Sequence, residues 1–198
     1  MAMVLPGCDE LFLRYLGPWY SEADWARRVY QATRPDIEQL GVDSELTASD
    51  ISRLTEESQA DVAERVCGMC EAATWDWAKL LKVRGTPSSQ WIAEFDRHFQ
   101  RRQIQEIIDR SDPQEIDNDY VVLCCELGTV LGTVLSSLEP RLAWLYDWPY
   151  WESGLYDQNT RSRINVFHWA VRKLSKDGAH ASLAVKMDEC RKLLHKTS

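Results

Sequence analysis

The most informative stretch of this chain is 142–175, LAWLYDWPYWESGLYDQNTRSRINVFHWAVRKLS. Aromatic rings recur through the stretch, and at Trp144 and Tyr146 they alternate with other residues. Alternation with a period of two, interrupted by turn-forming residues such as Pro149 and Gly154, is typical of short antiparallel strands. We therefore expect a small antiparallel sheet of two or three strands in this part of the chain.

The sequence on either side of this stretch predicts helices. From Thr55 to Lys82 the apolar positions keep a period near 3.6, and Gly85 and Pro87 then favour a stop. Further helices are expected at 88–108, from Asp112 as N-cap to about Leu138, at 169–176 and at 182–196. The predicted fold class is α+β, mainly α-helical, with a small C-terminal antiparallel β element packed on the helices.

The length of 198 residues suits a single domain. Within 1–198 we distinguish a helical part (1–140), a small β element that leads into a helix (141–176) and a C-terminal helix (181–196). With 44% hydrophobic and 27% charged residues, the composition is that of an ordinary globular protein.

The net charge of −8 is unevenly distributed along the chain. Residues 1–140 carry 13 basic and 25 acidic side chains, whereas residues 141–198 carry 10 and 6. Either the two parts attract each other within the fold, or an acidic face engages a basic partner protein. Nucleic acid and anionic membranes are not expected as partners, because both require a basic surface.

The segment 1–12, MAMVLPGCDELF, has no basic region before its short apolar run, so no secretory leader is predicted. The longest apolar run, 120–138, contains Glu126 and two glycines and is expected to be a buried helix rather than a membrane span. Six cysteines are scattered among apolar residues, which fits free thiols in a reducing compartment. We expect the protein to be cytoplasmic.

Three motifs allow a chemical and a structural interpretation. Cys67-Gly-Met-Cys70 has the spacing of redox and zinc sites, but it lies in mid-helix, where core packing is favoured. Gly128 and Gly132 are four residues apart, which favours close helix packing. A carboxylate cluster can either solvate and cap a helix start or hold a divalent cation, and we favour capping; its members are Asp109, Asp112, Glu115, Asp117 and Asp119.

The aromatic stretch also supplies the candidate binding residues, because Trp and Tyr combine large apolar area with a polar group. They are Trp148, Tyr150, Trp151, Glu152, Tyr156, Asp157, Arg163 and His168. His168 beside a carboxylate would suit a general base, but a half-buried structural histidine is favoured. We assign no catalytic residue, no metal ligand and no cofactor.

One set of motifs in the C-terminal half occurs together: Leu127-Gly128, Leu131-Gly132, Trp144, PYWESGLYD at 149–157 and RINVFHWAVRKLS at 163–175. In these motifs the chain resembles a family of bacterial proteins of unknown function. The resemblance covers about residues 120–177 and does not reach the N-terminal helices. It implies a bacterial origin and an α+β arrangement, and it brings no catalytic residue with it.

We expect a non-enzymatic protein-interaction module, such as an immunity or regulatory inhibitor protein that binds a basic partner. The alternative is a small-molecule-binding protein or a hydrolase-like enzyme with a pocket near the C-terminal aromatic segment. A third possibility is a homo-oligomer that buries exposed aromatic residues in a symmetric interface.

Overall fold

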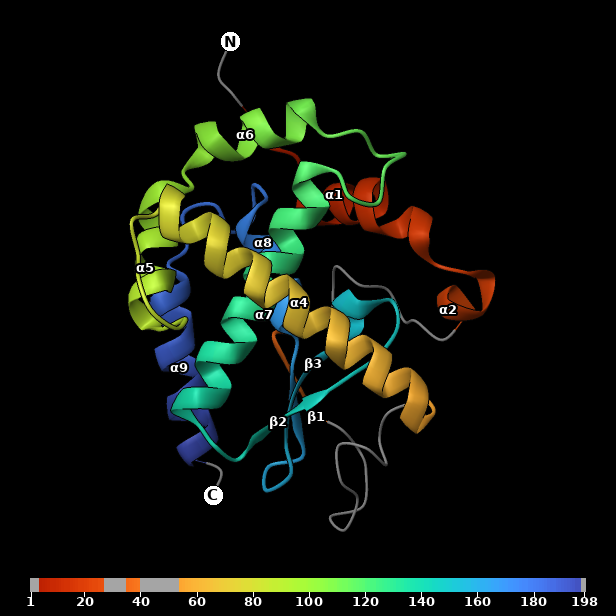
Figure 1. Cartoon of the computed structure of the whole chain (residues 1–198), viewed down its shortest axis with the longest axis vertical. Helices are drawn as coiled ribbons and strands as arrows, with labels where there is room; N and C mark the ends of the chain where they lie inside the picture. Colours follow the sequence, from red (N-terminus) through yellow and green to blue (C-terminus); the bar gives the residue numbers. More distant parts are fainter. Residues whose placement is uncertain (1–3, 27–34, 40–53, 197–198) are drawn as a thin grey trace.

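The computed structural model describes residues 4–26, 35–39 and 54–196. Helices dominate it, and one small antiparallel sheet packs against them, which confirms the predicted α+β class (Figure 1). The described helices are α1 (Cys8–Leu11), α2 (Glu22–Ala26), α4 (Glu56–Leu80), α5 (Ser89–His98), α6 (Arg101–Arg110), α7 (Asp119–Leu138), α8 (Val166–Lys173) and α9 (Leu183–Lys196). Short helical turns are η1 (Phe12–Leu16), η2 (Gly17–Trp19) and η3 (Tyr150–Glu152). The strands are β1 (Ile37–Gln39), β2 (Leu142–Leu145), β3 (Gly154–Asp157) and β4 (Ser162–Ile164).

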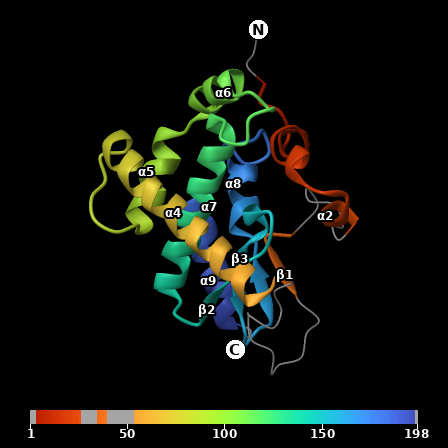
Figure 2. The same cartoon turned by 45° about the vertical axis from the view of Figure 1, so that its right-hand side comes forward.

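Helix α7 forms the centre of the core. It contacts α4, α6, α8, β2 and β3, and α4 lies across it in both views (Figures 1 and 2). Among the described helices, only α7 is long and apolar enough to span a membrane, and 72% of its most apolar window is buried inside the fold. The structure thus places this apolar run where a core helix is expected.

Two glycines of α7 allow close packing on its inner side. A Cβ at Gly128 would overlap the ring of Phe167 from α8, and one at Gly132 would overlap the indole of Trp144 from β2. The predicted packing role of this glycine pair is therefore confirmed. The two contacts join α7 to both α8 and the sheet.

A buried carboxylate lies in the interface between α4 and α7. Glu126 is 6% exposed, and the indole N–H of Trp77 in α4 donates a hydrogen bond to its Oε2 at 2.9 Å. Burial raises the pKa of Glu126 to about 7, although this hydrogen bond acts in the opposite direction. The packing of α4 on α7 thus includes one group that titrates near neutral pH.

The sheet has the strand order β1-β4-β3-β2, and all neighbouring strands are antiparallel. In the central pair, Leu155 of β3 faces Ile164 of β4. Strand β1 was not expected, and it brings residues 37–39 to β4, where Ile37 also faces Ile164. The sequence predicted a sheet formed by the C-terminal part alone. This prediction is wrong, because an early segment forms the fourth strand.

Several predicted helix limits agree with the structure. Helix α4 begins after Thr55, whose side-chain oxygen accepts a hydrogen bond from the Ser58 backbone N–H at 3.2 Å. Helix α9 also occupies the predicted region. Helix α8 begins at Val166, three residues earlier than expected, because β4 ends at Ile164.

Two helix predictions need correction. The helix expected at 88–108 is divided into α5 and α6 at Phe99, where the chain turns so that this buried ring stacks on Phe95 with a centroid separation of 4.4 Å. Helix α7 is capped by Asn118 rather than Asp112, since Asn118 Oδ1 accepts hydrogen bonds from the backbone N–H groups of Tyr120 and Val121. Asp112 instead caps a turn through the Gln114 backbone N–H at 2.9 Å.

Candidate functional site

The structure separates the eight predicted binding residues by burial. Six of them lie in the interior, namely Trp151, Glu152, Tyr156, Asp157, Arg163 and His168. Tyr150 is half-buried, and Trp148 has 42% of its surface exposed. Burial takes most of this set out of reach of a partner protein, so only Trp148 and the accessible part of Tyr150 are available for recognition.

Three of the buried residues hold η3 in place, two of them against the N-terminal segment and one against β4. The indole N–H of Trp151 donates to the Tyr20 hydroxyl at 2.8 Å, and that hydroxyl donates to Oε1 of Glu152. The guanidinium of Arg163 donates to the backbone carbonyl of Glu152. Hydrogen-bonded polar groups of this kind stabilise a buried junction, because each compensates the desolvation of the other.

Asp157 and His168 belong to different surroundings. Asp157 accepts hydrogen bonds from the Asn159 backbone N–H at 3.0 Å and the Thr160 hydroxyl at 2.9 Å, which closes the turn between β3 and β4. His168 stacks on Phe12, with 6.0 Å between the ring centroids. The structure therefore brings Glu152 and Arg163 together, while Asp157 serves the turn.

Hydrogen bonds in the loop between β2 and β3 position Trp148 at the surface. The Trp148 backbone N–H donates to Oδ1 of Asp147 at 2.9 Å, and the Asp147 backbone N–H donates to the Ser153 hydroxyl at 3.1 Å. The Trp148 ring meets Tyr150 edge-on with 5.0 Å between centroids. Tyr150 in turn packs edge-on against the buried Trp151, so the exposed indole of Trp148 is supported by packing against the core.

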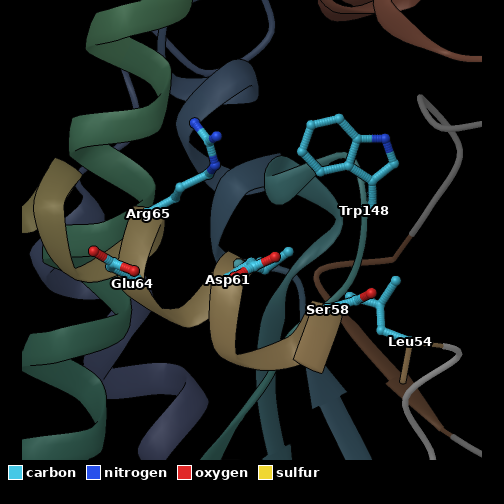
Figure 3. Close-up of a pocket in the computed structure, with 7 residues that line it drawn as sticks. Leu54, Ser58, Asp61, Glu64, Arg65 and Trp148 are labelled. Atoms are coloured by element: carbon cyan, nitrogen blue, oxygen red, sulfur yellow. The ribbon is translucent and has the colours of Figure 1, made fainter. Parts of the chain in front are cut away.

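A pocket of about 830 Å³ lies between Trp148 and the first half of α4 (Figure 3). The described residues that line it are Leu54, Ser58, Asp61, Val62, Glu64, Arg65 and Trp148. A volume of this size is within the range of small-molecule sites in proteins. The pocket combines an aromatic ring, apolar surface and side chains of both charges.

The solvent side of α4, which sequence analysis did not single out, carries an acidic face. We define it by the exposed side chains Asp61, Glu64, Glu71, Trp75 and Asp76. Trp75 is 74% exposed, and none of the four carboxylates forms an ion pair with a residue in the described ranges. A signal was present in the sequence, because these positions lie off the apolar stripe that Val62, Val66 and Trp77 define.

Other acidic residues of the N-terminal part are neutralised within the fold. Asp36 pairs with Arg172 at 2.8 Å and with Lys186 at 2.7 Å. Asp96 pairs with the buried Lys173 at 2.9 Å, and Glu139 pairs with Arg191 at 2.8 Å. Basic residues after position 140 thus meet acidic residues before it, as the first explanation of the charge distribution expects. The acidic face of α4 has no such neutralisation among the described residues.

The cysteine motif and the carboxylate cluster show no ligand geometry in the described part of the chain. Cys67 is exposed on α4, while the Cys70 thiol is half-buried and lies 3.4 Å from the Thr133 hydroxyl. Burial raises the pKa of Cys70, whereas thiol redox chemistry is favoured by a lowered pKa. Within the described residues, no group of three or more histidine, cysteine or acidic side chains is arranged to hold a metal ion.

Comparison with known proteins finds no match: no protein-family model, no curated protein and no solved structure matches this chain.

Proposed function

We propose that this protein is a non-enzymatic, cytoplasmic interaction module that binds a basic partner protein through the acidic face of α4. An immunity protein or a regulatory inhibitor acts in this way, by covering a surface of its target. The observation that carries the proposal is the largely exposed Trp75 among four carboxylates that have no ion-pair partner among the described residues.

Two physical effects favour this surface. Unpaired carboxylates on one helix produce a negative potential that accelerates association with a basic protein. Tryptophan is enriched among the residues that dominate binding energy, because it buries a large ring with little loss of rotamer freedom. Helix α4 has 25 residues and is therefore roughly 37 Å long, which is enough to span a standard protein interface.

The test begins with the tagged protein captured from its native cell and analysed by native mass spectrometry. We expect one stoichiometric basic protein as companion. Trp75→Ala should abolish its capture, and Glu71→Lys combined with Asp76→Lys should slow its association at low salt. A second copy of this chain as the only companion would instead indicate a homo-oligomer.

A matched control is available on α9. Asp188→Lys combined with Glu189→Lys reverses two exposed charges on another helix and should leave the capture unchanged. If both charge-reversal pairs weaken the complex equally, net charge rather than the α4 face determines binding. If neither Trp75→Ala nor the α4 pair affects it, the proposed surface is excluded.

The pocket beside Trp148 supports a second candidate function, the binding of a small molecule. It lies next to the C-terminal aromatic segment, as that alternative expects. Additional small-molecule mass on the purified protein in native mass spectra would favour this candidate, provided that Trp148→Ala removes the mass.

A further inference from the structure

Arg65 distinguishes the pocket beside Trp148 from the rest of the acidic face. It is the cation among the described lining residues, and two carboxylates lie close to it in sequence, Asp61 and Glu64. Asp61 precedes Arg65 by four residues, which is the favourable spacing for an ion pair on a helix. Even so, Arg65 forms no hydrogen bond or ion pair with any residue that the structure describes.

The Arg65 side chain instead extends toward the aromatic wall of the pocket. In Figure 3 its guanidinium reaches into the space beside the Trp148 indole, while Glu64 points in a different direction from the helix. Tyr150, which packs edge-on against Trp148, lies close enough for the Arg65 charge to affect its pKa. Burial raises the pKa of Tyr150, and the positive charge of Arg65 acts in the opposite direction.

The chemistry of these groups defines a ligand class. A guanidinium without a protein partner offers a planar set of N–H donors that matches a carboxylate in two parallel hydrogen bonds. The exposed indole of Trp148 offers a flat apolar surface for a ring. Asp61 and Glu64 leave the described lining with a net charge of −1, so an anion gains only through direct contact with Arg65, and a second negative charge on the ligand is disfavoured.

We propose that this pocket binds a small aromatic monocarboxylate, with its carboxylate on Arg65 and its ring against Trp148. The proposal rests on the second candidate function, the binding of a small molecule, and adds the class of ligand. It does not require the basic partner protein, although Asp61 and Glu64 belong both to the acidic face and to the lining of this pocket.

Four matched probes test the charge preference. They are 3-phenylpropionate, its neutral amide, the cation 3-phenylpropylamine, and phenyl phosphate, which carries a second negative charge. NMR titration of the indole N–H signals gives the dissociation constant, and Trp148→Phe identifies the Trp148 signal among the nine tryptophans. We expect 3-phenylpropionate to bind about tenfold more tightly than the amide, and more tightly than the other two probes.

Substitutions on one helix then identify the group responsible. Arg65→Gln should remove the tenfold preference for 3-phenylpropionate while leaving binding of the amide unchanged. Lys79→Gln makes the same charge change at an exposed position of α4 outside the pocket and should have no effect.

Three results would overturn the proposal. Equal or tighter binding of the amide, the amine or phenyl phosphate would exclude a monocarboxylate site but keep a small-molecule pocket. An Arg65→Gln variant that retains the preference would exclude Arg65 as its cause. If no probe shifts the Trp148 signal, the proposed ligand class is wrong. The second candidate function, the binding of a small molecule, fails only when native mass spectra also show no bound small molecule.

Discussion

The aromatic stretch 142–175 and helix α4 place their tryptophans differently: the stretch directs most of its rings inward, whereas α4 has one buried and one exposed. In the stretch, Trp151 is 2% exposed and belongs to a hydrogen-bonded core. In α4, Trp77 is equally buried, yet Trp75 two positions earlier is 74% exposed. The density of aromatic residues in a sequence therefore indicates where the core lies, and a single tryptophan on the polar side of a helix is the better indication of a surface site.

The largest expected effect concerns Trp151. Trp151→Ala removes a buried ring and the hydrogen bond to Tyr20, and should lower the free energy of unfolding by about 3–5 kcal/mol. Trp75→Ala is the matched substitution on α4, and it should change that free energy by less than about 0.5 kcal/mol. Urea unfolding followed by far-UV circular dichroism measures both. Comparable losses would contradict the contrast between the two regions.

The next effect concerns the interface of α4 with α7 and depends on pH. The pKa of Glu126 rises from its ordinary value of 4.5 to about 7 in the folded protein. The folded state therefore holds this proton more tightly, and the resulting stabilisation, present at low pH, is lost as pH rises from 4.5 to about 7. Between pH 5 and pH 8, the free energy of unfolding of the unmodified protein should fall by up to about 3 kcal/mol because of Glu126. The Glu126→Gln variant should not show this fall.

The control for this pH dependence is Glu71→Gln, because Glu71 is a glutamate on α4 that is exposed to solvent. Urea unfolding at pH 5 and at pH 8 compares each variant with the unmodified protein. If Glu126→Gln shows the same dependence as the unmodified protein, another group determines it.

A smaller effect distinguishes the glycines of the two helices. Gly128→Ala forces a Cβ into the ring of Phe167, which should cost about 1–3 kcal/mol. Gly68→Ala in α4 meets no atom within 4 Å and should stabilise the protein by about 0.5–1 kcal/mol, since alanine favours helix over glycine. The midpoint of thermal unfolding measures both shifts, and shifts of the same sign would refute the packing assigned to Gly128.

The sequence was most informative where local patterns decide the structure. The apolar period of 55–82 predicts α4 without reference to the rest of the chain, and the structure adds the Thr55 cap. The start of α7 was less predictable, because Asp112 and Asn118 are both good cap residues and the choice depends on tertiary contacts. Ser111, for example, accepts the Tyr120 backbone N–H at 3.0 Å. Strand β1 is only three residues long and exists through its pairing with a distant strand.

The candidate site was harder to predict than the fold. Composition drew attention to Trp148 and its neighbours, and the structure leaves Trp148 at a pocket but places Trp151 in the core. No pattern indicated that α4 forms the other wall of that pocket. Two segments separated by about eighty positions meet there, and such a meeting follows from packing rather than from local sequence.

The pairing of β1 with β4 has a consequence for synthesis of the chain. Ile37 leaves the ribosome long before its partner Ile164 exists, and the intervening residues include all of α4 and α7. At typical translation rates of about 5–20 residues per second, the first strand waits roughly 6–25 seconds for the edge that it completes. The sheet is therefore completed only after most of the helical core has been synthesised. In a nascent chain that stops before β4, residues 37–39 have no strand with which to pair.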